Sequence, residues 1–417
     1  MTHENLRTLL TDLAEDMSNV PQREYSGPAW ARVRRLQRRR VVLGTAAAVV
    51  LVAVPVALLL PWDDAPVQPV PPSIPVYSDA PLRGRAAHSA TLLADGRVLV
   101  VGGCATDGCS TAEVAPSSEY YVPGQGFTVG PELIQPRQGH SATLLRDGRV
   151  LVAGGWPREG ASTLDSAEVY HPTTGRFEPV GPMNRPRGGQ LATRLPDGRV
   201  LVVGGEAGAT PSTKTAELFD PQRNAFTLAA PMPQPSAPSG VIGLPDGRVL
   251  VVGGQDNTGK AVAGSIYDPR SDTWQPTGAL GTPRSKFALA PLPDGRVLVL
   301  GGTSDDRILL RTTEIYDAST GQFAPGPSMD TERYKFIDAV TVDAGGHIIV
   351  GGGTQLSVYE AGQFRPIAGT TGPIRWVPTV TSLPNGDILL IGGYDGRIGL
   401  HEDALLISAS QIASAIQ

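Results

Sequence analysis

A positively charged side chain recurs at one position of a repeated segment in this sequence. It lies ten residues before an Asp-Gly turn or its equivalent, and Ser236 is the exception. The residues concerned are Arg85, Arg137, Arg187, Arg284, Lys335 and Arg375. Because guanidinium groups bind carboxylates and phosphates through paired hydrogen bonds, a ring of such residues predicts a site for carboxylates, phosphates or acidic peptides. In the alternative, which we favour for most of them, each pairs with a carboxylate of a neighbouring repeat or caps backbone carbonyls.

Trp156 is the most prominent aromatic residue in the longer loops between the repeated strands. An indole there could stack on a sugar or on a partner side chain, or it could be buried between repeats, and both interpretations stay open. Glutamates also recur at one repeat position, and their recurrence favours hydrogen bonding within each repeat over a catalytic acid and base. They are Glu119, Glu168, Glu217 and Glu314. No Ser-His-Asp order, glycine-rich phosphate loop or histidine set with metal-ligand spacing stands out, so no catalytic residue is assigned.

Cys104 and Cys109 are the only two cysteines of the chain and lie five residues apart. In an oxidising compartment such a pair favours a disulfide that closes a small loop. A metal site is the weaker alternative, because two thiolates without a nearby histidine do not complete a tetrahedral shell. We therefore predict a disulfide and no bound metal or other cofactor.

These residues are positioned by seven repeats of about 48 residues, each with an Asp-Gly type turn, a short apolar strand and a Gly-Gly doublet. The doublets are Gly102-Gly103, Gly154-Gly155, Gly204-Gly205, Gly253-Gly254, Gly301-Gly302, Gly352-Gly353 and Gly392-Gly393. Each repeat divides into four strands bounded by turn residues. The pattern predicts an all-β, seven-bladed β-propeller over residues 74–410. The last repeat lacks a fourth strand, and we expect the segment from Ile74 to supply it and close the ring.

A repeated pattern from about residue 74 to 410 resembles kelch repeats. Its segments are of the types R-x-x-H-S-A-T-L-L, D-G-R-V-L-V-V-G-G and E-x-Y-D-P. The Asp-Gly-Arg form resembles the seven-bladed central domain of galactose oxidase. That family holds copper with two tyrosines and two histidines. The positions that match its propeller tyrosines are Ala87, Gly139, Gly189, Pro238, Lys286, Ile337 and Val377, and none is tyrosine. His88 and His140 match a copper histidine, but the other repeats have different residues there, so the resemblance implies the fold without the oxidase.

Residues 41–60 form an unbroken apolar run, long enough as a helix to cross a bilayer core of about 30 Å. Six arginines precede this run between residues 32 and 40, and Asp63 and Asp64 follow it. This bias predicts a single-pass anchor with residues 1–40 in the cytoplasm and the propeller outside the cell membrane. A cleaved signal peptide is the less favoured alternative, since no small-residue cleavage site follows the run before Pro61. The segment is similar to membrane anchors common in actinobacteria.

The remaining segments complete the domain organisation. Residues 61–73 are a proline-rich linker, and residues 411–417 form a C-terminal tail. Leucines at helical spacing in residues 1–20 indicate an amphipathic helix within the cytoplasmic tail, which could bind a cytoplasmic protein partner. Residues 1–40 carry eight arginines and five acidic residues, a net +3, so residues 41–417 carry −8 of the total −5. This balance leaves no basic patch for nucleic acid in the outer domain.

The function expected from the sequence is an extracytoplasmic binding module, anchored in the membrane through residues 41–60. Its partner would be a protein, a peptide or a glycan bound on the face that carries the long loops. Two alternatives stay open. One is a diverged galactose oxidase-like or hydrolytic enzyme, and the other is transmembrane signalling through the cytoplasmic tail in the way of an anti-sigma protein.

Overall fold

The computed structural model describes residues 79–107, 117–158, 160–206, 213–234, 239–254, 263–304 and 308–417. The chain divides into two units, Met1–Ile74 and Pro75–Gln417. The expected amphipathic helix, the predicted membrane span 41–60 and the linker 61–73 all lie outside the described residues. Within the described residues, no helix combines the length and the apolar character that crossing a bilayer requires.

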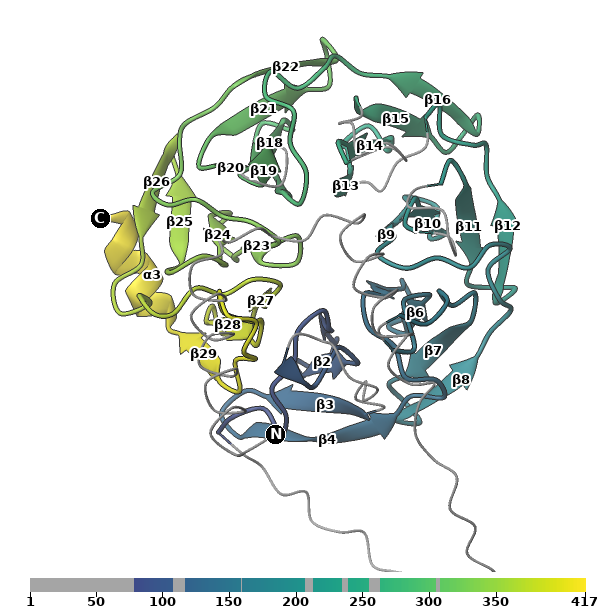
Figure 1. Ribbon diagram of the computed structural model, residues 1–417, viewed down its shortest axis with the longest axis horizontal. Helices are drawn as coiled ribbons and strands as arrows, with labels where there is room; N and C mark the ends of the chain where they lie inside the picture. Colours follow the sequence, from purple (N-terminus) through teal and green to yellow (C-terminus); the bar gives the residue numbers. More distant parts are fainter. Residues whose placement is uncertain are drawn as a thin grey trace, which may run out of the picture. The chain divides into compact units, whose positions relative to one another are not determined.

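Seven small antiparallel sheets surround a central axis in the described part of the second unit, as Figure 1 shows. The first strand of each sheet lies nearest the axis and the last lies outermost. Blade 1 comprises β1 (Ser89–Leu92), β2 (Val98–Val101), β3 (Ser117–Val122) and β4 (Gly126–Glu132). Blade 2 comprises β5 (Ser141–Leu144), β6 (Val150–Ala153), β7 (Ala167–His171) and β8 (Arg176–Pro179). Blade 3 comprises β9 (Leu191–Arg194), β10 (Val200–Val203), β11 (Ala216–Asp220) and β12 (Ala225–Leu228).

The other blades repeat this order. Blade 4 comprises β13 (Gly240–Gly243), β14 (Val249–Val252), β15 (Ser265–Asp268) and β16 (Thr273–Pro276). Blade 5 comprises β17 (Ala288–Pro291), β18 (Val297–Leu300), β21 (Thr313–Asp317) and β22 (Gln322–Pro325), with a small hairpin of β19 (Thr303–Ser304) and β20 (Ile308–Leu309). Blade 6 comprises β23 (Val340–Val342), β24 (Ile348–Val350), β25 (Ser357–Glu360) and β26 (Gln363–Pro366). Blade 7 comprises β27 (Thr379–Ser382), β28 (Ile388–Ile391) and β29 (Ala404–Ile407).

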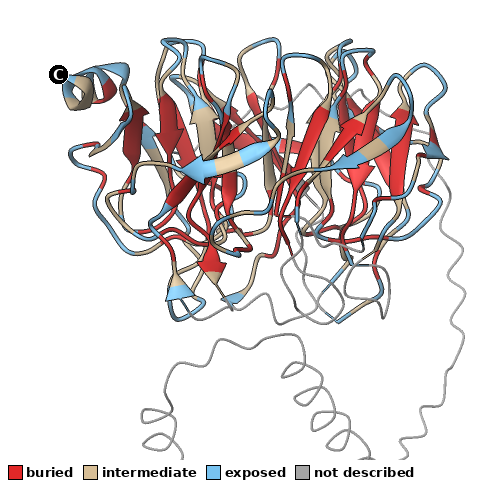
Figure 2. Ribbon diagram, turned by 90° about the horizontal axis from the view of Figure 1, so that it is seen from above, coloured by how far each residue is buried: buried red, intermediate tan, exposed pale blue. Residues whose placement is uncertain are grey.

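Apolar second strands form the core of the blades. Every residue of β2, β6, β10, β14, β18, β24 and β28 is buried, which Figure 2 shows as red strands inside the disc. In blades 1 to 6 an aromatic residue of the third strand packs on one of the fourth, with ring centroids 4.8–5.3 Å apart. These aromatic residues therefore serve cross-strand packing within each blade.

The Gly-Gly doublets join each blade to the next. The amide of Gly155 donates to the carbonyl of Arg187 at 2.9 Å, and Gly103 bonds Arg137 in the same way at 3.0 Å. A Cβ on Gly154 would lie 2.5 Å from the Arg187 oxygen, and Gly154 has a φ of +64°. The repeat therefore requires glycine here both for its left-handed backbone and for the close approach of the next blade.

Blade 7 meets blade 1 through contacts of this same type. Gly393 donates its amide to the Arg85 carbonyl at 2.9 Å, and His88 Nε2 lies 3.0 Å from Thr379 Oγ1. The ring is thus closed, although blade 7 has three strands in the described residues. The predicted fourth strand from Ile74 lies outside them.

The two faces of the ring differ. One face, here called the crown face, carries the connections between blades and the loops between second and third strands. The opposite face, here called the turn face, carries the Asp-Gly turns. In the Asp-Gly-Arg turns of blades 1 to 5 the arginine folds back onto the aspartate, and at Asp294 the hydrogen bond from Arg296 lowers the pKa of the carboxyl.

The segment expected as a C-terminal tail forms a helix, α3 (Ala409–Ile416). Ser408 caps it through a capping box with Gln411. Ile412 is buried in the core shared with blade 6, and the amide of Ala409 donates to the Asp387 carboxylate of the last turn.

Candidate functional site

The recurrent arginines lie inside the blades. Each guanidinium pairs with a carboxylate of its own blade, not of a neighbouring one as expected. The pairs are Arg85 with Glu119, Arg137 with Glu168 (2.7 Å), Arg187 with Glu217 (2.7 Å), Arg284 with Glu314 (2.9 Å) and Arg375 with Asp403 (2.5 Å). All five arginines are buried, and burial lowers the pKa of Arg137 against the opposing effect of Glu168. These guanidinium groups are therefore not exposed to an external ligand.

Each of these ion pairs connects three segments of a blade. Arg137 Nη1 also donates to the carbonyls of Gly154 and Ser166, at 2.8 and 3.1 Å. The second oxygen of Glu168 accepts from the amide of Ile134, which lies in the connection that enters the blade. Glu119, Glu217 and Glu314 accept an equivalent amide bond, so the prediction of a hydrogen-bonding role for these glutamates is confirmed.

Lys335 does not belong to this set, and its assignment from the sequence was wrong. Counted in strand register, blade 6 has two more residues between its arginine and its first strand, because Val340 pairs with Val350 where blade 1 pairs Ala90 with Val100. This insertion shifts the repeat. Arg333 takes the structural position instead: it is buried, pairs with Asp330 at 2.9 Å and offers its carbonyl to Gly302. The position matched to a family tyrosine is accordingly Lys335 and not Ile337.

A belt of backbone hydrogen bonds runs around the axis at the crown face. It consists of the residues two positions after each structural arginine, which have left-handed backbones. Their φ values are Ala87 52°, Gly139 56°, Gly189 64°, Lys286 56°, Lys335 54° and Val377 58°. The amide of one donates to the carbonyl of the one before it: Gly189 to Gly139 at 2.8 Å, and Lys335 to Lys286 at 3.0 Å. The belt thus places Lys286 and Lys335 at the crown-face mouth of the ring.

Five side chains from blades 5, 6 and 7 meet beside this belt and are here called the lysine–aromatic cluster. They are Lys286, Tyr334, Lys335, Trp376 and Tyr394. Lys286 Nζ donates to the Tyr334 hydroxyl at 3.0 Å, and Lys335 Nζ donates to the Tyr394 hydroxyl at 2.8 Å. The two ammonium groups lie 5.2 and 5.0 Å from the centroid of the Tyr334 ring. Trp376 packs edge-on against Tyr334 and Tyr394, with centroids 5.9 and 5.7 Å away.

The aromatic members depart from the repeat. Tyr334 and Trp376 follow a structural arginine directly, where other described blades have small or neutral polar residues. Those residues are Ala86, Gln138, Gly188 and Ser285. Tyr394 follows a Gly-Gly doublet, and only Trp156 supplies another aromatic residue at that position among the described blades. Residues that recur in every repeat do not point to this cluster, and its signal in the sequence is the departure of Tyr334, Trp376 and Tyr394 from the repeat.

The cluster can bind an anion beside an aromatic surface. Tyr334 is buried, while Lys286, Lys335, Trp376 and Tyr394 each keep part of their surface exposed. Ammonium groups over aromatic rings are held in place by cation–π attraction and remain hydrogen-bond donors. A carboxylate or sulfate could accept from both lysines, and the indole and phenol faces could contact a sugar ring or a peptide.

Trp156 lies at the opposite side of the same mouth. Its indole lies over the backbone of Gly139, Gly188 and Gly189, where an added Cβ would come within 2.5–3.2 Å of the ring. The residue is half-buried, so it both packs between blades 2 and 3 and keeps an exposed edge. Cys104 is buried and takes part in a disulfide, and its predicted partner Cys109 lies outside the described residues.

His88 and His140 make contacts between blades. Their Nε2 atoms lie 3.0 Å from Thr379 Oγ1 and 2.9 Å from Ser89 Oγ, and burial lowers both pKa values to about 3. Among the described residues, no group of three or more histidine, cysteine or acidic side chains is arranged to hold a metal ion. The positions matched to the family's tyrosine ligands carry no tyrosine, so these donors do not fit the copper site of galactose oxidase.

Comparisons with known proteins agree with this architecture. The family model of the Kelch motif matches residues 137–184 and 192–233. No curated protein matches the sequence. A fungal alcohol oxidase of the AA5 family, in complex with copper, is similar in structure, with a TM-score of 0.62, 18% identity, and coverage of 81% of this chain and 76% of that chain. The structure of YjhT has a TM-score of 0.51 and 13% identity, covering 79% of this chain and 96% of that one. At such identities the similarity concerns the fold alone, and the chain is a seven-bladed β-propeller with kelch motifs and a galactose oxidase-like fold.

Proposed function

We propose that this protein is a membrane-anchored, extracytoplasmic binding module that binds an acidic glycan or an acidic peptide at the lysine–aromatic cluster. The observation that carries the proposal is the backbone conformation of Lys286 and Lys335. Both lysines have φ values near +55°, in a conformation that blades 2 and 3 form with glycine, blade 1 with Ala87 and blade 7 with Val377.

A left-handed backbone disfavours any residue with a side chain, by about 1–2 kcal/mol. Stability alone would therefore favour glycine at both positions, as at Gly139 and Gly189. Strain of this kind is found at functional sites, where the surrounding structure enforces it. Ala87 and Val377 bear the same strain with apolar side chains. The support for binding is therefore that two adjacent blades accept this strain with a charged side chain.

Charge supports the same proposal. The chain has only four lysines, Lys214, Lys260, Lys286 and Lys335, so two of the four meet at this cluster. Residues 41–417 carry a net negative charge, so two neighbouring ammonium groups form a local positive site on an otherwise acidic domain. An acidic polymer would pair its carboxylates with Lys286 and Lys335 and place its body against Trp376 and Tyr394.

Anchoring through residues 41–60 would suit a receptor of this kind. If the segment from Ile74 completes blade 7, the linker enters the ring from the turn face. The crown face would then be directed away from the bilayer. The cytoplasmic residues 1–20 could bind a protein partner that responds to ligand.

Binding of the full chain to defined polymers tests the proposal. The panel comprises polygalacturonate as an acidic glycan, polyglutamate as an acidic peptide and dextran as a neutral glycan, measured by surface plasmon resonance. We expect one acidic polymer to bind and dextran not to bind. The double variant Lys286→Gly and Lys335→Gly should bind at least about tenfold more weakly, equivalent to about 1.4 kcal/mol.

Ala87→Gly is the matched control, because it relieves the same backbone strain and removes no charge. It should bind like the unchanged protein. Equal binding of all three proteins, or binding of dextran as strong as that of the acidic polymers, would contradict the proposal.

A further inference from the structure

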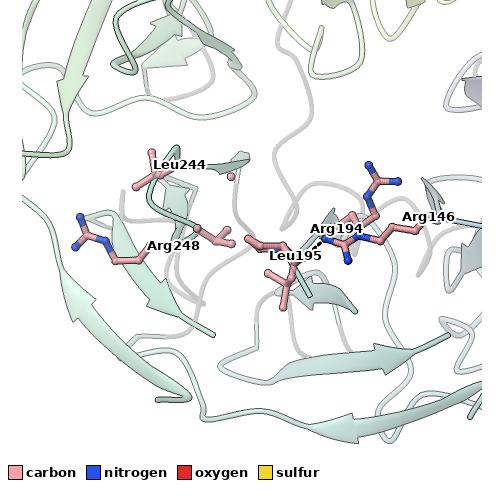
Figure 3. Close-up of a pocket in the computed structure, with 9 residues that line it drawn as sticks. Arg146, Arg194, Leu195, Leu244 and Arg248 are labelled. Carbon is pink, nitrogen blue, oxygen red and sulfur yellow. Dashed lines mark hydrogen bonds between the residues drawn. The ribbon is translucent and has the colours of Figure 1, made fainter. Parts of the chain in front are cut away.

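Two arginines meet on the turn face, beside a cavity of about 300 Å³. Arg146 lies in the turn between β5 and β6 of blade 2, and Arg194 is the last residue of β9 in blade 3. Figure 3 shows the two side chains close together at one side of this cavity, with Leu195 and Leu244 also lining it. The crown face and its lysines take no part in this arrangement.

Both arginines depart from the repeat. The residue before the Asp-Gly turn or its equivalent is proline or alanine in the other repeats, namely Ala94, Pro196, Pro245, Pro293, Ala344, and Pro384 before Asn-Gly. Only blade 2 has a charged residue there, Arg146. The last residue of the innermost strand is uncharged in the other blades, namely Leu92, Leu144, Gly243, Pro291, Val342 and Ser382. Only blade 3 has a charged residue there, Arg194. Two independent departures therefore converge on one place.

The two side chains are held by reciprocal bonds between their blades. Arg146 Nη2 donates to the carbonyl of Pro196 in blade 3, and Arg194 Nη1 donates to the carbonyl of Leu144 in blade 2 at 3.0 Å. The stem of Arg146 lies across Gly198, where an added Cβ would be 3.3 Å from its Cδ atom. Each guanidinium is thus positioned by backbone carbonyls, and its other N–H groups remain available to a ligand.

Within the described residues, no salt bridge joins a carboxylate to either arginine, although Asp197 lies near enough to Arg146 for an electrostatic interaction. Neither arginine forms an ion pair there, because the nearby turn aspartates bind the arginine of their own turn. Those pairs are Asp147 with Arg149, Asp197 with Arg199 and Asp246 with Arg248, at 2.7–2.8 Å. Next to Arg194, blade 4 has Gly243, and an added Cβ there would meet nothing within 4 Å. The site therefore combines two exposed arginines that form no salt bridge in the described residues with open space.

We propose that Arg146 and Arg194 form a binding site for a phosphate group. A carboxylate has two oxygens and is satisfied by one guanidinium fork, whereas a phosphate has enough oxygens to accept from two guanidinium groups at once. Leu195 and Leu244, which are both buried, line the cavity beside the two exposed arginines. The phosphate belongs either to a soluble phosphate monoester or to the phosphodiester of a lipid headgroup.

Isothermal titration calorimetry on the full chain tests this site. The probes are inorganic phosphate, glycerol 3-phosphate as a monoester, glycerophosphoglycerol as a soluble headgroup diester, and acetate as a carboxylate. The variants follow the repeat itself: Arg146→Pro copies Pro196, and Arg194→Leu copies Leu144, so both residues are already tolerated at these positions. Arg176→Gln, which removes an exposed arginine of β8, is the control.

We expect phosphate and at least one ester to bind more tightly than acetate. The double variant should lose at least about tenfold in affinity, and Arg176→Gln should not. A preference for the monoester would indicate a soluble ligand, and equal or tighter binding of the diester would indicate a lipid headgroup. Absence of phosphate binding, or equal binding by the double variant, would overturn the proposal without affecting the crown-face proposal.

Discussion

Arg187 and Glu217 form a fully buried ion pair, with Nη2 and Oε1 2.7 Å apart and neither side chain accessible to solvent. Arg187 also donates to the carbonyls of Gly204 and Thr215, and its own carbonyl accepts from Gly155 of the preceding blade. One residue therefore organises its own blade and the junction with its neighbour.

Removing one partner of this pair should strongly destabilise the propeller. Glu217→Ala leaves a buried guanidinium uncompensated, and we expect the free energy of unfolding to fall by about 3–5 kcal/mol. Asp197→Ala breaks an exposed pair and should cost at most about 1 kcal/mol. Urea denaturation compares the two variants. Losses of similar size would show that the buried pair has no special structural role.

Replacing both partners should cost less than replacing one. Arg187→Met combined with Glu217→Leu leaves no buried charge, so the double variant should be more stable than Glu217→Ala. The same denaturation series measures this. A double variant less stable than the single one would mean that the hydrogen bonds of Arg187 outweigh the unpaired charge.

His88 should make stability depend on pH. Burial lowers its pKa from 6.5 to about 3, so at pH 5 it is neutral in the folded protein and protonated in the unfolded chain. The unfolded state then binds more protons, so stability is full above pH 6.5 and falls as the pH decreases toward 3. At pH 5 the loss is about 2 kcal/mol relative to pH 7.5.

His88→Gln isolates this contribution, because Gln190 holds the same position in blade 3 and donates to Ser141 at 3.3 Å. The unchanged protein should lose about 2 kcal/mol more than the variant between pH 7.5 and pH 5. Chemical denaturation at the two pH values measures the difference. Parallel pH profiles for the two proteins would contradict the assigned protonation.

Lys335→Gly should separate stability from binding. Glycine relieves the strain of the left-handed backbone, but it also raises the conformational entropy of the unfolded chain. Because the two effects oppose each other, the free energy of unfolding should stay constant or rise by about 1 kcal/mol. The bond to the Tyr394 hydroxyl is lost, and with it part of the proposed ligand site. Thermal unfolding and polymer binding are measured on the same sample. A clear loss of stability would mean that Lys335 is retained for structure.

The architecture could be predicted because the doublets obey a strict physical requirement. Only glycine tolerates both the left-handed φ of Gly154 and an approach of 2.5 Å to the Arg187 carbonyl. Whether the recurrent arginines face a ligand or lie buried in ion pairs could not be predicted as firmly. Both arrangements would place one arginine in each repeat. The lysine–aromatic cluster and the Arg146–Arg194 pair were not predicted, because each is assembled from different blades and appears only where the repeat is interrupted.

Lysine labelling provides the most direct test of the central claim that ligand binds at the crown-face mouth. The full chain is acetylated with a limiting reagent, with and without the acidic polymer that binds best, and modification is quantified by mass spectrometry. We predict that the polymer protects Lys286 and Lys335, whereas exposed Lys214 reacts equally in both samples. Protection of Lys214 alone, or unchanged labelling of Lys286 and Lys335 at saturating polymer, would contradict the account.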